Sequence, residues 1–206
     1  MSKAAGIMLG LFGPDGSGKS TVADVLEQRC ENAGMRTSRM HWRPGFLPYR
    51  GGMNGDGKAD FTNPQQLNSR RGLAGWLVFI YIVMDFVLGY LCFIRPRLRR
   101  GIIVIYERYY YDIIMDQKRY GLRVPASVCR AIARLVMPVP DMVILLDAPA
   151  NILYARKQEL GRIEIERQRR ELKEYFQRFS NYRVVDVEHN DPDQVADIIL
   201  AAIDIN

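Results

Sequence analysis

Eight consecutive residues near the start of the chain have types and spacing suited to phosphate chemistry. Residues 13–20 read Gly-Pro-Asp-Gly-Ser-Gly-Lys-Ser, which fits the pattern G-x-x-x-x-G-K-[ST]. Glycines let the backbone curl so that several N–H groups point at one phosphate, and a following helix N-terminus adds partial positive charge. We expect Lys19 to reach the β- and γ-phosphates of a nucleotide and the Ser20 hydroxyl to bind Mg²⁺. The predicted phosphate-binding residues are Gly13, Asp15, Gly16, Ser17, Gly18, Lys19, Ser20 and Thr21.

The elements predicted around this loop are those that must position it. An apolar run over Ile7–Phe12 predicts a buried strand before the loop, and apolar residues at helical spacing predict a helix over Ser20–Asn32. Further strands are predicted over Thr37–Trp42, Ile102–Tyr106, Met142–Leu146 and Val184–Val187. Further helices are predicted over Pro125–Met137, over 150–179 with a break near Leu160-Gly161, and over 191–203. Alternating strands and helices predict an α/β fold of three layers, a five-stranded parallel sheet with helices on both faces.

Length and composition narrow the class of protein. A chain of 206 residues predicts one domain over 1–206, and 48% hydrophobic residues exclude a disordered chain. Three widely spaced cysteines and two distant histidines argue against a disulfide framework and a zinc site, so a cytoplasmic location is expected. Arg outnumbers Lys by 23 to 6, which suits phosphate-bearing partners. Basic residues form no stripe with interleaved aromatics, so we expect no nucleic-acid partner.

Three segments of the chain resemble the thymidylate kinase family. The loop, extended to Thr21, is close to that family's G-x-D-G-x-G-K-S-T. Residues 94–109 read I-R-P-R-L-R-R-G-I-I-V-I-Y-E-R-Y, similar to the family's I-R-P-x-L-x-x-G-x-x-V-x-x-D-R-Y. Residues 144–149 and the following Arg156-Lys157 resemble its strand and Arg-rich lid. The resemblance implies a P-loop kinase that uses ATP and Mg²⁺ to phosphorylate a nucleoside monophosphate, by default dTMP to dTDP.

The same resemblance implies roles for matching residues. Glu107 stands where the family has an Asp that holds the Mg²⁺ shell, and Arg108 would bridge the acceptor and transferred phosphates. Arg43, in His-Trp-Arg-Pro-Gly, matches the Arg that grips the acceptor phosphate. Asp15 matches the loop acid that contacts the sugar 3′-hydroxyl. Tyr109 is assigned to the acceptor, although at least one of the three tyrosines at 109–111 is expected in the core.

The lid segment, 156–170, is expected to supply the catalytic arginine because position 16 of the loop is Gly. We assign Arg156 and Arg162 to this role. The stretch 156–183 holds seven arginines, and the other five are expected to pair with glutamates on a solvated helix face.

Two departures from the family leave the acceptor open. The family has an aromatic residue and, after three more residues, an Arg that together bind the base, whereas Ile82 and Phe86 occupy those positions here. Asp85 beside them matches a polar position. The predicted acceptor-side loop, 46–71, is long and rich in glycine. A kinase of the same family with another acceptor, such as a glycan or lipid-linked sugar, is the first alternative, and a non-catalytic nucleotide-binding module is the second.

A strongly apolar segment, Leu73–Ile94, carries a single charge, Asp85. Its length would suffice for a membrane span. Basic residues flank both ends and a central Asp is costly in lipid. A single span would also put Lys19 and Arg108 on opposite sides of a bilayer, although both serve one nucleotide. We expect instead a helix buried between the domain and a partner. The resemblance implies a homodimer through it, and a peripheral membrane contact is the alternative.

Overall fold

The computed structural model describes residues 6–48, 72–120 and 122–203. These belong to two compact units, and each is described by itself. The first unit comprises residues 1–41, 97–108 and 140–206, and the second comprises 42–96 and 109–139, as far as they are described. Neither unit is one continuous segment, so no linker in the sequence marks a boundary between them. Most of the predicted acceptor-side loop, residues 49–71, lies outside the described residues.

The first unit contains the sheet. Its strands are β1 (Met8–Phe12), β2 (Thr37–His41), β3 (Ile103–Glu107), β4 (Met142–Asp147) and β5 (Tyr182–Asp186). They are hydrogen-bonded in the order β2-β3-β1-β4-β5, and every pair is parallel. The central strand pairs Leu9 with Ile105 on one side and with Met142 on the other. The predicted five-stranded parallel sheet is confirmed, and strand ends differ from the prediction by one or two residues.

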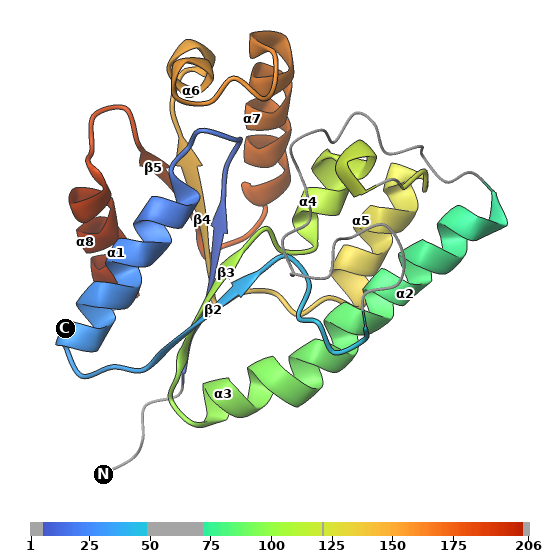
Figure 1. Ribbon diagram of the computed structural model, residues 1–206, viewed down its shortest axis with the longest axis horizontal. Helices are drawn as coiled ribbons and strands as arrows, with labels where there is room; N and C mark the ends of the chain where they lie inside the picture. The colour runs from blue at the N-terminus through green and yellow to red at the C-terminus, as the bar shows by residue number, and fades with distance from the viewer. Residues whose placement is uncertain (1–5, 49–71, 121, 204–206) are drawn as a thin grey trace. The chain divides into compact units, whose positions relative to one another are not determined.

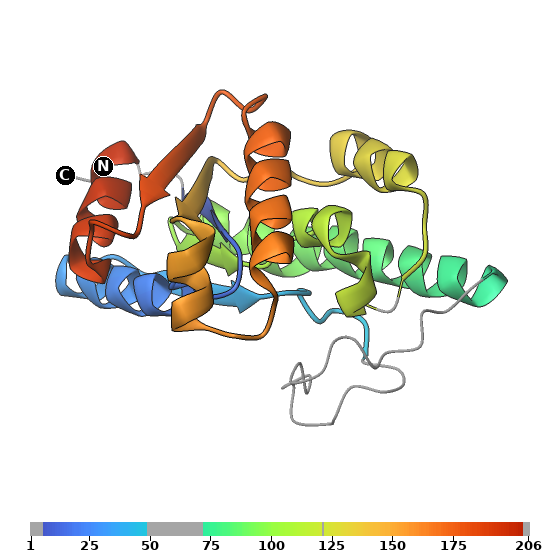
Figure 2. The ribbon, with the colours of Figure 1, turned by 90° about the horizontal axis from the view of Figure 1, so that it is seen from above.

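Helices cover both faces of this sheet. On one face, α1 (Lys19–Asn32) and α8 (Pro192–Ala202) lie side by side, and their apolar residues join the core of buried residues that includes Leu9, Ile105 and Ile144 (Figure 1). On the other face lies α7 (Arg162–Phe176) (Figure 2). The ring of its last residue, Phe176, lies 4.6 Å from that of Phe12. The predicted break in the long charged helix is confirmed, because α6 (Ala150–Arg156) ends before α7 begins.

Local sequence signals explain where the helices of this unit begin and end. Gly34 has φ 71° just after α1, where its N–H donates to the carbonyl of Glu31 while Met35 N–H donates to that of Cys30. A left-handed glycine with these two bonds is the Schellman ending of a helix. At the start of α8, the Asp191 side chain accepts from the backbone N–H of Gln194, and the Asp191 N–H donates to the side-chain Oε1 of Gln194. This reciprocal capping box satisfies otherwise unpaired N–H groups of the first turn.

The second unit is helical with an aromatic core. Its elements are α2 (Leu73–Gly89), the π-helical turn η2 (Tyr90–Ile94), α4 (Tyr111–Met115), the 3₁₀ helix η3 (Gln117–Tyr120) and α5 (Ala126–Leu135). The helix continues as α3 (Arg95–Arg99) into the first unit. The ring of Phe86 meets the edges of Trp42, Tyr109 and Tyr110 at centroid distances of 5.4 to 5.8 Å. The sequence analysis did not predict α4 or η3.

The segment Leu73–Arg99 is long and apolar enough to cross a membrane by length and composition, and a third of its most apolar stretch is buried. On one side of the helix, Phe79, Ile82 and Phe86 are buried within the second unit, to which α2 itself belongs. The opposite side exposes Leu73, Leu77, Ile80, Met84 and Leu91, which we call the exposed apolar stripe. One side of the helix is therefore buried in its own unit as expected, and the contact of the other side with a partner stays a prediction.

Candidate functional site

The phosphate loop lies between β1 and α1, and its glycines adopt conformations that other residues disfavour. Gly13, Gly16 and Gly18 have φ angles of 149°, 86° and 79°. A Cβ atom at Gly16 would also stand 2.5 Å from the carbonyl oxygen of Leu153. The loop therefore has no room for a side chain at position 16. Without a shift of the backbone, the catalytic arginine could not be located at that position.

Lys19 is the first residue of α1 and is almost fully buried. Its Nζ donates to the carbonyls of Gly13 at 2.7 Å and Pro14 at 2.8 Å, and it lies 3.3 Å from Ser17 Oγ. The amine is thus held over the loop itself, beside the helix N-terminus. A phosphate seated in the loop would meet this ammonium together with the backbone N–H groups.

Ser20 and Glu107 present oxygen atoms to each other from different elements. Ser20 lies in the first turn of α1, and Glu107 is the last residue of β3, the neighbour of β1. Ser20 Oγ donates to Glu107 Oε2 at 2.9 Å, and the Glu107 side chain is 1% exposed. Mg²⁺ binds oxygen ligands such as hydroxyl and carboxylate groups, so the chemistry of this pair fits the predicted metal ligands.

Arg108 follows Glu107 in a strained conformation. Its φ is 55°, in the left-handed region that non-glycine residues seldom adopt. Its Nη2 donates to the carboxylate of the buried Asp15 in the phosphate loop. Strain of this kind concentrates at functional sites, where surrounding contacts hold it. The structure thus brings together two residues that the sequence assigned to the acceptor side.

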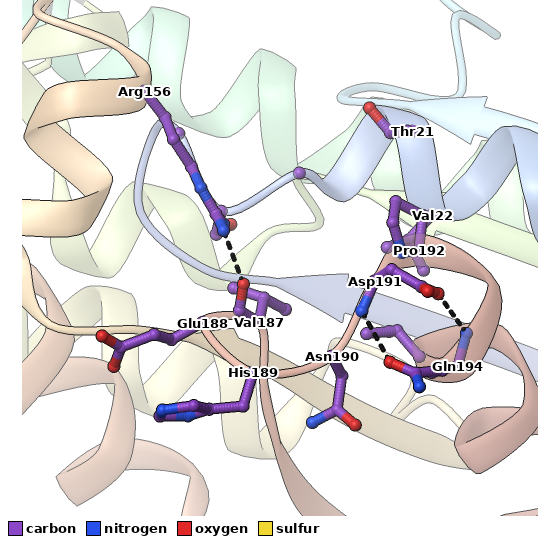
Figure 3. Close-up of a pocket in the computed structure, with 14 residues that line it drawn as sticks. Thr21, Val22, Arg156, Val187, Glu188, His189, Asn190, Asp191, Pro192 and Gln194 are labelled. Carbon is purple, nitrogen blue, oxygen red and sulfur yellow. Dashed lines mark hydrogen bonds between the residues drawn. The ribbon is translucent and has the colours of Figure 1, made fainter.

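A pocket of about 600 Å³ opens beside the loop, within the range of small-ligand sites. Gly16, Ser17, Gly18 and Thr21 line it from the loop, and the segment Val187–Pro192 lines it from the connection between β5 and α8. Figure 3 shows Arg156 reaching into it and donating from Nη2 to the carbonyl of Val187 at 2.8 Å. The pocket has the position and the polar lining to hold the rest of a nucleotide whose phosphates occupy the loop.

His189 is a titratable group on the rim of this pocket. Its Nδ1 lies 2.7 Å from Oδ2 of Asp186, and both side chains are exposed. The hydrogen bond to the Asp186 carboxylate raises the pKa of His189 above 6.5, and the same contact lowers the pKa of Asp186. Protonated histidine would add positive charge next to a bound nucleotide.

The arginines of the lid segment differ in what their side chains contact. Arg156 lines the pocket, whereas Arg162 is exposed and places its guanidinium 5.1 Å from the ring centroid of Tyr154. Arg167 pairs with glutamates of its own helix, Glu164 and Glu171, as expected for a solvated face.

Arg169 departs from that expectation. It reaches Asp147 at the end of β4 with bonds of 2.7 and 3.0 Å, besides its helical partner Glu166. Burial alone would raise the pKa of Asp147, but the bonds from Arg169 and Lys173 lower it overall. These contacts fix α7 to the sheet.

In the second unit, Arg43 is buried and forms an ion pair with Asp85. Its Nε donates to Asp85 Oδ2 at 2.8 Å, and its Nη2 donates to the carbonyl of Leu47 at 3.1 Å. Asp85 also accepts from the backbone N–H groups of Gly45 and Leu47, at 3.2 and 2.6 Å. The carboxylate therefore holds both Arg43 and the turn that follows it.

The two positions that depart from the family pattern, Ile82 and Phe86, are buried in the second unit. Tyr109 is buried there as well, with its hydroxyl donating to the carbonyl of Pro138 at 2.8 Å. Tyr110 and Tyr111 are also core residues, so the expectation that at least one of the three is core is met by all of them. The contact of Tyr109 with an acceptor stays a prediction.

Sequence reasoning missed two parts of the site. One is the segment Val187–Pro192, which was assigned only to a strand end and a helix cap. The carboxyl ends of parallel strands share one edge of a sheet, so the connection after β5 could have been expected beside the loop after β1. The other is Arg39 on β2, which contacts Glu107. Nothing in its local sequence distinguishes it from the other arginines.

Comparison with known proteins agrees with this geometry. A family model described as thymidylate kinase matches residues 12–197. A "probable thymidylate kinase" of Caldivirga maquilingensis is 29% identical over 163 residues, which cover 77% of this chain and 71% of the relative. Another from Archaeoglobus fulgidus is 25% identical over 157 residues, covering 76% and 72%. A thymidylate kinase of Xanthomonas campestris is 27% identical over 161 residues, covering 76% and 62%.

Proposed function

The chain belongs to the thymidylate kinase family, and we propose that it transfers the γ-phosphate of ATP to a nucleoside monophosphate, with dTMP as the default acceptor and dTDP as the product. The observation that carries the proposal is the assembly at the end of β1 and β3. There a glycine-rich loop holds the Lys19 ammonium, Ser20 and Glu107 pair their oxygens where the loop leads into α1, and residues of the loop line one pocket. A nucleotide kinase needs these parts to bind a triphosphate and its metal.

Phosphoryl transfer depends on positioning and on charge stabilisation more than on covalent chemistry by the protein. We infer that the loop N–H groups and Lys19 hold the β- and γ-phosphates of ATP, and that the pocket beside Thr21 receives the rest of the donor. Ser20 and Glu107 would hold Mg²⁺, which supplies charge neutralisation on the β- and γ-oxygens. Arg156 is the lid arginine better placed to act on the donor, because it lines this pocket and Arg162 does not.

On the acceptor side, we carry over the roles that the family implies. Arg108 would contact the acceptor and transferred phosphates, and its strained backbone and its bond to Asp15 support a functional position. Asp15 would contact the sugar hydroxyl. Arg43 would bind the acceptor phosphate, supported by its rigid anchoring on Asp85. Tyr109 would contact the acceptor from its buried position in the second unit.

A second acceptor class, a glycan or a lipid-linked sugar, is favoured by one observation. The aromatic and arginine that bind the base in the family are replaced by Ile82 and Phe86, and both are buried. The ring of Phe86 is enclosed by Trp42, Tyr109 and Tyr110, so it is not available to stack on a base. An acceptor without a nucleobase would not need that pair.

We also propose that two copies of the chain associate through the exposed apolar stripe. Five large aliphatic side chains in line along one helix form a continuous apolar surface, which soluble monomers rarely leave uncovered. A peripheral membrane contact by the same stripe, next to the arginines of 95–100, is the competing use. A homodimeric kinase of nucleotide metabolism would act in the cytoplasm.

The deciding experiment is an ATP-consumption screen of the full chain with Mg²⁺ over nucleoside monophosphates, nucleosides and sugar acceptors. Turnover that is fastest with dTMP supports the default acceptor. Turnover with a sugar acceptor and none with monophosphates supports the second class. ATP binding without turnover on any acceptor would contradict the proposed kinase activity and favour a nucleotide-binding module. A thermal-shift measurement with dTMP comes first, since a ligand at a hundred times its Kd adds about 2.7 kcal/mol to the free energy of unfolding.

A further inference from the structure

Arg39 makes a direct contact with Glu107 that neither the family pattern nor the local sequence indicates. It lies on β2, whose register pairs His41 with Glu107 on β3. Residues two apart on a strand point to the same face, so the long Arg39 side chain can run along that face toward Glu107. Its Nε donates to Glu107 Oε1 at 2.5 Å, while the other oxygen of the same carboxylate, Oε2, accepts from Ser20 Oγ.

The burial of Glu107 makes this contact energetically important. A carboxylate that is 1% exposed needs a compensating charge and hydrogen bonds, and removing its partner leaves a costly unpaired buried charge. Arg39 supplies a basic partner through the ion pair between its Nε and Oε1 of Glu107. Its guanidinium therefore offsets the negative charge of Glu107 and fixes one of the two carboxylate oxygens.

The rest of the guanidinium is attached to the start of α1. Nη2 donates to the carbonyl oxygen of Ser20 at 3.2 Å. Nη1 pairs with Asp24, one turn further along the helix, and lies 3.6 Å from Oε2 of Glu27, two turns further along. One planar group thus contacts Ser20 through its backbone and Glu107 through its side chain. These are the two residues whose oxygens form the proposed metal ligands.

We propose that Arg39 is a positioning residue for the Mg²⁺ site, an inference that rests on the proposed function. The planar fork of arginine has fixed donor directions, so it can set the distance and orientation between two attached groups. Outer partners of this kind orient metal ligands, and their loss typically lowers metal affinity by about 10- to 100-fold. Arg39 leaves Oε2 of Glu107 and Oγ of Ser20 facing each other, ready to bind the cation of a metal–nucleotide complex.

The test measures metal binding directly. Mn²⁺ replaces Mg²⁺ as the probe, and its affinity for the full chain in the presence of ADP is measured by electron paramagnetic resonance. Arg39→Gln removes the charge, and we expect Mn²⁺ affinity to fall about 10-fold or more. Arg39→Lys keeps the charge without the fork and should recover only part of the affinity. The half-saturating Mg²⁺ concentration for ATP turnover should rise in step, while KM for ATP at saturating Mg²⁺ changes little.

Two matched variants separate positioning from simple anchoring of α1. Arg36→Gln removes a nearby arginine that donates to the carbonyl of Arg100, and it should bind Mn²⁺ as the unaltered chain does. Asp24→Asn breaks only the exposed outer ion pair of Arg39, so it should have a small effect. Arg39→Gln with unchanged Mn²⁺ affinity, or Asp24→Asn with an equal loss, would overturn the proposal. Because binding needs no acceptor, failure of an acceptor screen leaves this result decisive.

Discussion

Ser20 Oγ and Glu107 Oε2 lie 2.9 Å apart although 87 positions separate the two residues in the chain. The parallel pairing of β1 with β3 brings them together, because it places the end of β3 beside the loop that leads into α1. The Ser20 hydroxyl and the Glu107 carboxylate both offer oxygen atoms as ligands for a divalent cation.

The Ser20–Glu107 pair is expected to act as a unit in metal binding. Ser20→Ala and Glu107→Gln should each raise the Mg²⁺ concentration needed for half-maximal ATP turnover. The double variant should lose less than the sum of the two, with a coupling free energy of about 0.5 to 3 kcal/mol, since contacting residues are not additive. Measuring Mg²⁺ dependence for all four proteins tests this. Strictly additive losses would show that the two oxygens do not share a cation.

Lys19→Met is expected to lower ATP turnover by about 10²- to 10³-fold, the loss typical of removing one donor that stabilises charge developing in a transition state. The methionine keeps the aliphatic stem in its buried position, so the midpoint of thermal unfolding should change little. Lys173→Met, which removes a half-exposed ammonium that pairs with Asp147 away from the phosphate loop, is the matched control and should keep its turnover. Retained turnover in Lys19→Met would refute the phosphate-loop assignment.

Arg43→Ala is expected to have two separable effects. Loss of the buried ion pair leaves the Asp85 carboxylate without its cation and should lower the free energy of unfolding by about 3–5 kcal/mol. The proposed phosphate contact predicts that the acceptor KM rises far more than the ATP KM. Denaturant titration and steady-state kinetics measure the two.

The double variant Arg43→Ala with Asp85→Asn tells these effects apart. It removes the unpaired charge, so part of the lost stability should return, while the acceptor KM should stay high. Recovery of both together would mean that Arg43 only supports the fold of its unit.

The exposed apolar stripe is expected to hold two copies together. Leu77→Glu combined with Ile80→Glu should convert a dimer into a monomer in size-exclusion chromatography with light scattering, because two charges would be buried at the interface. Leu135→Glu, which alters an equally apolar and 83% exposed residue of α5, should leave the mass unchanged. A monomeric unaltered chain that floats with anionic vesicles would assign the stripe to a membrane surface instead.

The fold was predictable because its signals are local. Apolar runs of five or six residues mark the buried strands, and Gly34 and Asp191 mark helix ends by their own backbone chemistry. The helices α4 and η3 escaped prediction because they are short. Their tyrosines, among them Tyr111, are fixed by packing against other rings and not by a helical repeat.

The phosphate loop, the parallel sheet and the family could be predicted from the amino-acid sequence, since each depends on residue types at fixed spacing. The sequence also located Lys19, Ser20 and Glu107 as candidates. The partner of each arginine is seen only in the tertiary structure. Arg39 pairs with Glu107 and Arg43 pairs with Asp85. Arg156 lines the pocket together with the segment Val187–Pro192. Arginine is long and flexible, and many share the same local sequence context, so only the strand order and the burial of each carboxylate select its partner.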